Sequence, residues 1–278
     1  MPDPGDPGTG PDGPGANAHD IAAHGPTGAH DPTVYGATIA DEYDELYDDV
    51  LDTEAAVACL ADLSAGGPVL ELGVGTGRLA LPLAGRGLAV TGVDASPAMV
   101  ARLAAKPGVE RLRVVVGDIA DVEAPGGPFR LAVLAFNTVF ALPTDAAQLA
   151  CFATVARHLA PGGRFVVEAW VLDPGRFVGG AAVGVRYVMP DRVSLDTAVL
   201  DPAPLPPGGQ NVRAVQVVFS PGRVRLFPTA HRYAGPSELD VMAGTVGFAL
   251  EHRWAGWGRA PFDEASRTHV SVYRAPDR

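Results

Sequence analysis

Lysine is nearly absent from this chain of 278 residues: Lys106 is the only one, and arginine supplies the rest of the positive charge. Acidic residues outnumber basic ones by 32 to 21, which gives a formal net charge of −11. Because binding to a phosphate backbone needs a basic face, this balance argues against a nucleic-acid partner. We therefore expect the protein to act on small molecules.

Cysteines and long apolar runs are scarce too. Cys59 and Cys151 are isolated and lack the spacing of metal ligands, so we expect two reduced thiols in the core. No apolar run approaches the roughly 18 residues of a membrane-spanning helix, and the N-terminus lacks the pattern of a signal peptide. These absences predict a soluble cytoplasmic protein with no membrane partner.

Residues 1–33 consist mostly of proline, glycine, aspartate and other small or polar residues. A segment with so little to bury cannot offset the entropy cost of ordering, and we expect a disordered tail. Its histidines, His19, His24 and His30, have neither a cysteine nor a fixed scaffold beside them. A solvated tail is therefore favoured over a metal site, and no metal is expected.

A glycine cluster follows an apolar run in the stretch V-L-E-L-G-V-G-T-G-R, residues 69–78. Gly73, Gly75 and Gly77 allow the backbone to turn with positive φ and a ligand to lie directly on the main chain. The next apolar run ends at Asp94, about 20 residues after the first glycine, where a carboxylate can accept hydrogen bonds from ribose hydroxyls. The pattern predicts a nucleotide-like cofactor.

The glycine spacing favours one class of cofactor. Dinucleotide sites use G-x-G-x-x-G, because the pyrophosphate needs the helix N-terminus held close. Here the spacing is G-x-G-x-G, and no third glycine stands at the dinucleotide position. A cofactor without phosphate is favoured, with NAD as the alternative.

The stretch E-L-G-V-G-T-G resembles the first motif of the class I S-adenosylmethionine-dependent methyltransferases. The similarity continues with V-D-A-S at residues 93–96, G-D-I at 117–119 and a P-G-G turn at 161–163. Four motifs in this order, over roughly residues 40–278, are much more specific than one glycine cluster. The resemblance implies that S-adenosyl-L-methionine is the cofactor.

The resemblance also implies which residues hold the cofactor. The glycines would carry its methionine part, Asp94 its ribose, and Ala95 and Met99 its adenine face. Asp118 would read the adenine amino group, although it could instead be a turn carboxylate that caps its own loop. The residues implied are Tyr43, Glu71, Gly73, Gly75, Thr76, Gly77, Arg78, Asp94, Ala95, Met99, Asp118, Ile119, Phe136 and Asn137.

An acidic segment with aromatic residues precedes the glycine cluster. Tyr43 and Tyr47 are four positions apart, which places them on one face of a short helix over 39–47. The segment resembles the Y-D-x-x-Y block that, in many small-molecule methyltransferases, folds over the cofactor. We expect residues 34–65 to form lid helices that exclude water.

The remaining pattern predicts the architecture. Strand-like and helix-like runs alternate through residues 66–170, as in an α/β, Rossmann-like, doubly wound sheet. Residues 171–235 show short β-type runs at 183–188, 212–219 and 223–233, which predict an antiparallel β insertion over the carboxyl edge of the sheet, as a substrate cap. Residues 236–278 are expected to add a last helix and a final antiparallel hairpin.

Three side chains are candidates for removing a proton from the methyl acceptor. Glu168 lies in an E-x-W strand ending similar to that of amino-sugar N,N-dimethyltransferases, and the alternative is a carboxylate that only hydrogen-bonds its neighbours. His231 lies on the insertion, where a structural role that ties the insertion to the core competes with catalysis. Tyr47 of the lid is the third candidate.

Methyl transfer from a sulfonium is an in-line displacement, so alignment and exclusion of water can supply most of the rate. A base is needed only where the acceptor must lose a proton. We expect transfer to a small-molecule amine or hydroxyl, with the amine slightly ahead. The alternatives are a quinone or phenol methyltransferase and a cofactor-binding protein without methyl transfer. A homodimer remains open.

Overall fold

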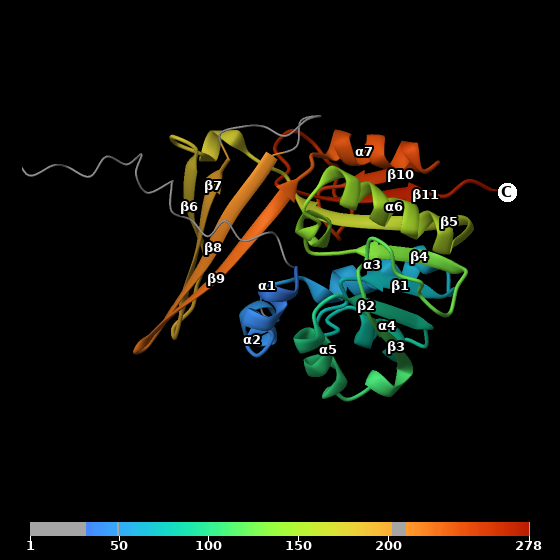
Figure 1. Ribbon diagram of the computed structural model, residues 1–278, viewed down its shortest axis with the longest axis horizontal. Helices are drawn as coiled ribbons and strands as arrows, with labels where there is room; N and C mark the ends of the chain where they lie inside the picture. Colours follow the sequence, from blue (N-terminus) through green and yellow to red (C-terminus); the bar gives the residue numbers. More distant parts are fainter. Residues whose placement is uncertain (1–31, 49, 202–209, 278) are drawn as a thin grey trace, which may run out of the picture.

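The computed structural model describes residues 32–48, 50–201 and 210–277. Figure 1 shows a central sheet with helices on both faces and, beside it, a separate antiparallel sheet. We expected a disordered tail over residues 1–33, and residues 1–31 of it lie outside the described residues. Pro32 and Thr33, which we assigned to that tail, instead begin helix α1.

The central sheet has seven strands in the order β10-β11-β5-β4-β1-β2-β3. Strands β1 to β5 pair in parallel, β11 runs antiparallel to β5, and β10 runs antiparallel to β11. This confirms the Rossmann-like core with a final antiparallel hairpin. The strands are β1 (Val69–Leu72), β2 (Val90–Asp94), β3 (Leu112–Val116), β4 (Phe129–Leu134), β5 (Leu159–Trp170), β10 (Ala249–Trp254) and β11 (Thr268–Arg274).

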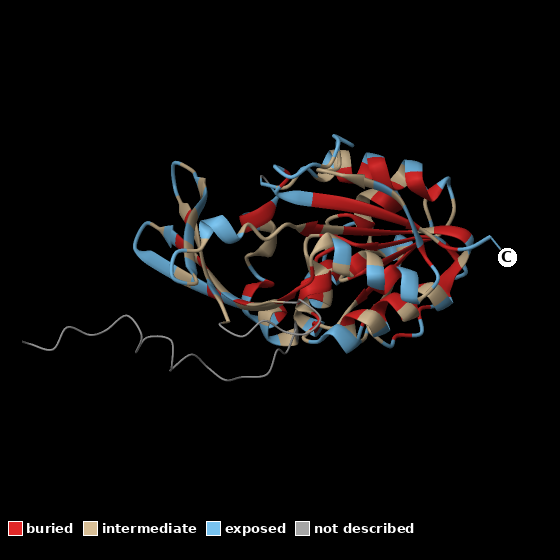
Figure 2. Cartoon of the chain, turned by 90° about the horizontal axis from the view of Figure 1, so that it is seen from above, coloured by how far each residue is buried: buried red, intermediate tan, exposed pale blue. Residues whose placement is uncertain are grey.

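Each face of this sheet has its own core, because successive side chains of a strand point to opposite faces. Leu70 and Leu72 pack with the side that carries α6 and α7, and Val69 packs with the side that carries α3 and α4. Figure 2 shows the buried central strands between these layers. The helices are α3 (Thr53–Ser64), α4 (Ala80–Gly85), α5 (Pro97–Ala104), α6 (Asp145–His158) and α7 (Pro236–Thr245), with short 3₁₀ turns η2 (Val109–Arg111), η3 (Thr138–Ala141) and η4 (Pro174–Arg176).

The second sheet is the expected insertion. It has four antiparallel strands in the order β6-β7-β8-β9: β6 (Ala181–Val188), β7 (Val193–Leu200), β8 (Gln210–Ser220) and β9 (Arg223–Tyr233). The sequence pattern missed β7, because Ser194, Asp196 and Thr197 interrupt its apolar run. Register explains the interruption: Ser194 and Asp196 share the face that meets the N-terminal helices, where polar side chains have partners.

The N-terminal segment forms two helices where we expected one. Helix α1 (Pro32–Ile39) lies against α5, and α2 (Tyr43–Tyr47) follows after a turn. Gly36 makes the contact with α5 close, since a Cβ at this position would be 2.3 Å from the Oγ of Ser96. Ile39 and Leu46 are fully buried and pack against Phe227 of β9. The N-terminal helices thus lie between the central sheet and the second sheet (Figure 1).

A buried arginine fastens the second sheet to the core. Arg232, at the end of β9, is fully buried and donates to the Oε1 of Gln148 on α6 at 2.5 Å. Its guanidinium also pairs with Glu238 on α7. A charge taken out of water needs such partners, so this arginine fixes where the insertion joins α6 and α7.

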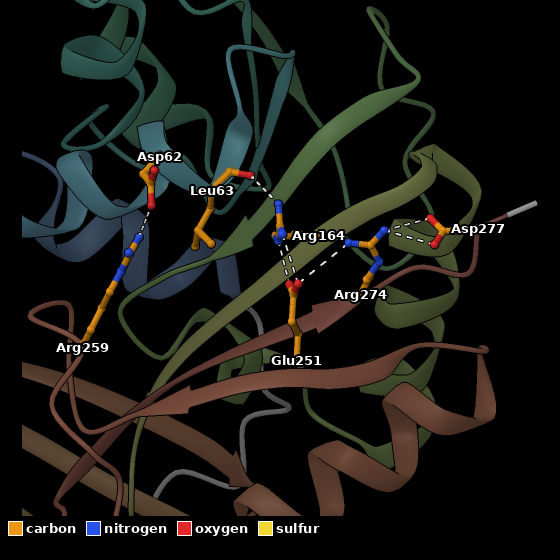
Figure 3. A network of polar contacts seen from close by, with 7 residues as sticks. All are labelled: Asp62, Leu63, Arg164, Glu251, Arg259, Arg274 and Asp277. Atoms are coloured by element: carbon orange, nitrogen blue, oxygen red, sulfur yellow. Dashed lines mark hydrogen bonds and ion pairs between the residues drawn. The ribbon is translucent and has the colours of Figure 1, made fainter.

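A second polar network holds the antiparallel edge of the central sheet (Figure 3). Arg164, near the start of β5, donates to both carboxylate oxygens of Glu251 on β10, at 2.7 and 3.0 Å. Its guanidinium also donates to the carbonyl of Leu63 at the end of α3, at 3.4 Å. Arg274 on β11 lies 3.8 Å from Glu251. The network lies away from the carboxyl end of β5, so it supports the fold without entering the site.

Two further findings bear on the sequence expectations. Cys59 and Cys151 are both free and buried, as expected for core thiols. Among the helices of the described residues, none is long and apolar enough to cross a membrane.

Candidate active site

The glycine loop after β1 has the backbone that its sequence predicts. Gly73, Gly75 and Gly77 have φ values of +79°, +53° and +87°, all in the left-handed region that side chains disfavour. A Cβ at Gly73 would lie 2.5 Å from the Cγ2 of Thr138, and one at Gly77 would lie 2.4 Å from the Cδ1 of Leu103. Around Gly75 nothing lies within 4 Å of that position, so a ligand can approach the main chain there.

Asp94 at the end of β2 is already engaged with this loop. Its Oδ2 accepts a hydrogen bond from the Gly75 N–H at 2.8 Å, and its Oδ1 accepts one from the Ser96 N–H at 2.8 Å. Burial raises the pKa of the carboxyl group, and the two N–H donors oppose that shift. Each carboxylate oxygen keeps a second lone pair, so ribose hydroxyls can still donate to it.

Glu71 on β1 has a buried carboxyl group that is only partly hydrogen-bonded. Its side chain is 4% exposed, and its Oε2 has no hydrogen-bond donor among the described residues. Burial raises the pKa of Glu71 to about 8, while the guanidinium of Arg78 opposes the rise. A buried carboxylate oxygen without a donor fits a cationic ligand, and the ammonium of the implied cofactor is such a group.

The N-terminal helices are tied to the glycine loop through Asp44 of α2. Thr76 donates its hydroxyl hydrogen to the Oδ1 of Asp44 at 2.5 Å, and the ammonium of Lys106 lies 2.6 Å from the Oδ2. Sequence reasoning did not single out Asp44 as a site residue, although it is the aspartate of the Y-D-x-x-Y block. One carboxylate therefore links α2, the loop and the end of α5.

Aromatic side chains from three parts of the chain meet beside the loop. The Tyr43 and Tyr47 rings are 4.8 Å apart, and the Tyr47 and Phe136 rings are 5.1 Å apart. The guanidinium carbon of Arg78 lies 5.9 Å from the centre of the Phe136 ring. The hydroxyl of Tyr47 donates to the Oε1 of Gln216 on β8 at 2.6 Å, and burial raises the pKa of this tyrosine. Tyr47 thus joins the N-terminal helices to the second sheet.

Glu168 near the end of β5 has both carboxylate oxygens in use. Its Oε2 accepts a hydrogen bond from the Phe136 N–H at 2.9 Å, and its Oε1 accepts one from the indole N–H of Trp257 at 2.7 Å. Burial raises the pKa of Glu168, and these donors together with Arg78 oppose the rise. The alternative that we considered, a carboxylate bonded to its neighbours, matches this geometry.

The turn that Glu168 holds is strained. Phe136 and Asn137, after β4, have φ values of +49° and +67°, a region that costs free energy for phenylalanine and that asparagine tolerates better. The Oδ1 of Asn137 accepts a hydrogen bond from the Trp170 N–H at 2.8 Å. The turn between β4 and η3 is therefore fixed by two side-chain contacts with β5.

Trp170, at the end of β5, contacts two residues of the second sheet. Its ring stacks on Tyr233 at 4.9 Å with an interplanar angle of 17°. The ring of His231 meets it edge-on, at 6.4 Å and 80°. His231 therefore lies beside the carboxyl end of β5, on the face of β9 that is turned towards the core.

Of the residues that we expected at the adenine, Asp118 lies on an exposed turn, whereas Ile119 and Met99 are buried. Asp118 is exposed, and its Oδ1 accepts a hydrogen bond from Ala120 of its own turn at 2.9 Å, the alternative that we considered. Ile119 packs in the core on the α6 side. Met99 is buried in the cluster that includes Ile39 of α1, and Ala95 is half-buried.

Sequence reasoning missed other residues that the fold brings to the site. Arg186 on β6 lies with its guanidinium carbon 5.6 Å from the Tyr47 ring and pairs with Asp196 at 3.0 Å. Trp257 reaches Glu168 from 89 positions along the chain, and no local pattern marks such a contact. Within the described ranges, no group of three or more metal-ligating side chains is found.

Comparison with known proteins identifies the family. Residues 69–163 match the sequence profile of a methyltransferase domain. The chain is 28% identical over 248 residues to the cypemycin N-terminal methyltransferase of a Streptomyces species, which covers 87% of this chain and 98% of the relative.

Solved structures agree with this match. The CcbJ methyltransferase of Streptomyces caelestis is 39% identical, with a TM-score of 0.78 over 88% of this chain and 99% of that one. The sugar N-methyltransferase KedS8 of a Streptoalloteichus species shares the fold at 19% identity, with a TM-score of 0.58 over 95% and 99% of the two chains. With the glycine loop, Asp94 and the buried Glu71, these matches show that the chain is an enzyme of the class I S-adenosylmethionine-dependent methyltransferase family, with S-adenosyl-L-methionine as its cofactor.

Proposed function

We propose that this enzyme methylates an amine of a small molecule, and that this amine binds beside the turn formed by Phe136 and Asn137. One observation supports the location. The turn is held by Glu168 on one side, faces the glycine loop through Arg78, and bonds to Trp170, which contacts His231. Residues beside the glycine loop and residues beside the second sheet thus meet at this turn. The likeness to an N-terminal methyltransferase, over 87% of this chain, favours nitrogen as the acceptor.

Each side chain has a role in this proposal. The cofactor supplies an activated methyl group, so the protein mainly aligns, encloses and deprotonates. Glu71 binds the cationic end of the cofactor and Asp94 binds its ribose. Tyr43 and Tyr47 exclude water. The other cofactor contacts proposed are Gly73, Gly75, Thr76, Gly77, Arg78, Ala95, Met99, Asp118, Ile119, Phe136 and Asn137.

His231 is the proposed proton acceptor. Imidazole is neutral over part of the physiological pH range and can take the proton that an amine carries before methylation. Glu168 is proposed to position the turn, because both of its oxygens accept hydrogen bonds within the protein. Tyr47 is proposed to act through packing, since its hydroxyl donates to Gln216.

The setting of the reaction is part of the proposal. A net charge of −11 supports an acceptor other than a nucleic acid. Two buried free thiols suit a reducing compartment, which supports the cytoplasm. We propose in addition that the enzyme acts as a homodimer.

The proposal is tested first by calorimetric titration with S-adenosylmethionine and S-adenosylhomocysteine, with NAD as the control. We expect micromolar binding of both adenosyl ligands and none of NAD. Acceptors are then offered as matched pairs that differ only in an amine or a hydroxyl at one position. Turnover confined to phenols or quinones would contradict the amine proposal, and binding without turnover across the whole panel would contradict methyl transfer.

His231→Gln tests the proton acceptor. We expect kcat to fall by about 100-fold, the usual size of a general-base contribution, with the cofactor Kd unchanged. The fall should be smaller at high pH, where the amine loses its proton to solvent. His252→Gln, in a ring pair with Trp254 on β10, is the matched control and should leave kcat unchanged. A kcat unaffected by His231→Gln would remove His231 from catalysis.

A further inference from the structure

A guanidinium group lies beside Gly184 on the inner face of the second sheet, the face turned towards the N-terminal helices. Register defines this face, because Gly184 pairs with Asp196 and Asp196 pairs with Gln216. Gln216 accepts the hydrogen bond of Tyr47 and therefore points towards the N-terminal helices. The Nη2 of Arg176 lies 2.7 Å from the point that a Cβ of Gly184 would occupy. Arg176 thus lies on the inner face, at a position where the strand has no side chain.

Arg186 reaches the same face through an irregularity in β6. The pairing with β7 shifts between Val185 and Tyr187, and Arg186 is the extra residue of this bulge. A bulge re-aims the side chain of such a residue. The guanidinium carbon of Arg186 lies 5.6 Å from the centre of the Tyr47 ring, and its Nε lies 3.0 Å from each carboxylate oxygen of Asp196. The bulge therefore brings a second guanidinium group beside the pair of Gly184 and Asp196.

The protein uses few of the donors of these two side chains. Arg186 donates to Asp196 through Nε, and its Nη groups bond no other residue that the structure describes. Arg176 is exposed, and its side chain forms neither an ion pair nor a hydrogen bond within the described residues. Acidic residues outnumber basic ones in this chain by 32 to 21, and still only one carboxylate serves the two arginines. One positive charge on the inner face is thus left for a ligand.

The donors and the charge together select a carboxylate. The free edge of a guanidinium group presents parallel N–H groups that match the two oxygens of a planar carboxylate. A phosphate monoester carries about 1.5 to 2 negative charges at pH 7, which exceeds the single uncompensated charge of the two arginines. The carboxylate of Asp196 would repel the excess. A ligand group with one negative charge is therefore favoured.

This arginine pair lies close to the turn that is proposed to hold the acceptor amine. The Tyr47 ring is 5.1 Å from the ring of Phe136 and 5.6 Å from the guanidinium carbon of Arg186. Two contacts thus separate the turn from the arginine, a distance that a molecule of several atoms can span. One acceptor can therefore reach both places.

The inner face between these places is lined with small side chains. One row of paired residues separates the row of His231 from the row of Gly184. All four of its members are half-buried: Ala182, Ala198, Ala214 and Thr229. Side chains of this size leave room above the sheet for the body of an acceptor.

We infer that the acceptor carries a carboxylate in addition to its amine, and that Arg176 and Arg186 bind this carboxylate. The inference rests on the amine methylation proposed above and adds a second group to the acceptor. An α-amino acid is excluded, because its amine and its carboxylate are attached to the same carbon. The two arginines select the acceptor and take no part in the transfer of the methyl group.

Two probes that differ only at one end test the inference. ω-Aminooctanoate and ω-aminooctanamide are titrated by calorimetry into the enzyme saturated with S-adenosylhomocysteine. We expect the wild type to bind the carboxylate at least about 10-fold more tightly than the amide, because the amide loses the charge-assisted hydrogen bonds. Equal affinities for the two probes, or no detectable binding of the carboxylate, would overturn the inference.

Substitution of each arginine tests the assignment of the residues. Arg176→Gln removes an exposed side chain without a partner among the described residues, so this variant should fold as the wild type does. Arg176→Gln and Arg186→Gln should each weaken binding of the carboxylate by at least about 5-fold and leave binding of the amide unchanged. Arg186→Lys should lose less, because it keeps the charge without the paired N–H groups. The Kd of the cofactor reports folding in every variant.

Arg213→Gln is the matched control. Arg213 lies on β8 of the same sheet and pairs with Asp201 at 3.3 Å, but register places it on the opposite face. Its loss should leave the affinity for the carboxylate unchanged. Equal weakening by Arg213→Gln and Arg176→Gln would indicate a general effect of charge and overturn the inference.

Two further measurements separate the remaining outcomes. ω-Aminooctyl phosphate is titrated as a third probe, and tighter binding of this probe than of the carboxylate would overturn the choice of a carboxylate. Methyl transfer to the amines is scored on its own. Methylation of the carboxylate and the amide with the same KM would overturn only this inference. A preference for the carboxylate in binding, without methylation of any amine, would contradict only the proposed function.

Discussion

The indole N–H of Trp257 donates to the Oε1 of Glu168 at 2.7 Å, from a loop between the last two strands of the central sheet. The other oxygen of Glu168 accepts the N–H of Phe136. Two such donors hold the carboxylate in one orientation, and they oppose the burial that raises the pKa of Glu168. This arrangement fits a residue that shapes the turn better than one that shuttles protons.

Glu168→Gln should therefore affect folding and cofactor binding together. The amide presents only one acceptor oxygen to two donors, so one buried N–H loses its partner, at a cost of about 1–3 kcal/mol. Unfolding in urea and calorimetric titration should both show the loss. Trp257→Phe should show a smaller loss of both. If Glu168→Gln lowers kcat alone, with stability and cofactor Kd unchanged, the glutamate is a base after all.

Asp94→Ala should weaken cofactor binding by about 1–3 kcal/mol, or about 5- to 150-fold in Kd, because ribose hydroxyls lose their acceptor. The structure adds a second effect, since the N–H groups of Gly75 and Ser96 also lose theirs. We expect the unfolding free energy of the apoprotein to fall as well. Asp191→Ala, at an exposed position between β6 and β7, is the comparison and should leave both quantities unchanged. Unchanged affinity in Asp94→Ala would remove this residue from the ribose site.

Asp44→Asn should loosen the N-terminal helices. It removes the ion pair with Lys106 and weakens the bond from Thr76, so the segment before α3 should be cleaved faster in limited proteolysis. Cofactor affinity should fall by about 3- to 10-fold, for a contact worth about 1 kcal/mol. Asp41→Asn serves as the control, because its pair with Arg102 is exposed. Equal cleavage of both variants would show that Asp44 does not hold the helices.

Glu71 should make the apoprotein less stable as pH rises, which is the opposite of the usual effect of a paired carboxylate. Its folded pKa of about 8 lies above its ordinary value of 4.5, because burial disfavours the charge. The folded state thus binds more protons than the unfolded state between these values, and stability decreases as pH rises through this window. Urea unfolding from pH 5 to 9 should show this decrease in the wild type, and Glu71→Gln should reduce it.

The same group should release a proton when the cofactor binds. The cofactor's ammonium favours ionised Glu71, so calorimetry near pH 7 in buffers of different ionisation enthalpy should detect proton release in the wild type. Glu71→Gln should bind more weakly and release less. Binding enthalpies that are independent of the buffer in the wild type would contradict the pairing of Glu71 with the ammonium.

The strands and the glycine loop were readable from sequence because their determinants are local. Alternating glycines require positive φ, and a buried parallel strand such as β4 reads as an apolar run that only Arg130 interrupts. Strand β7 was missed because its polar residues face partners on other elements, which no window of sequence displays. Helix α1 was missed because its apolar residues do not follow a clear helical period.

The site was predictable only in part, for a related reason. Asp94 and the glycines follow from spacing along the chain. The surroundings of Glu168 depend on Trp257, and those of Tyr47 on Gln216, which are 89 and 169 positions away. The sequence could nominate both residues as candidates, but the partners that decide between a chemical and a structural role come from the fold.

The pairing of Lys106 with Asp44 has a practical use. Because this is the chain's only lysine, an amine-reactive dye has one side-chain target, apart from the chain's own amino terminus. That target is 28% exposed and lies 2.6 Å from a carboxylate on α2. The rate of its labelling therefore reports, in an otherwise unmodified enzyme, how often the N-terminal helices leave the glycine loop.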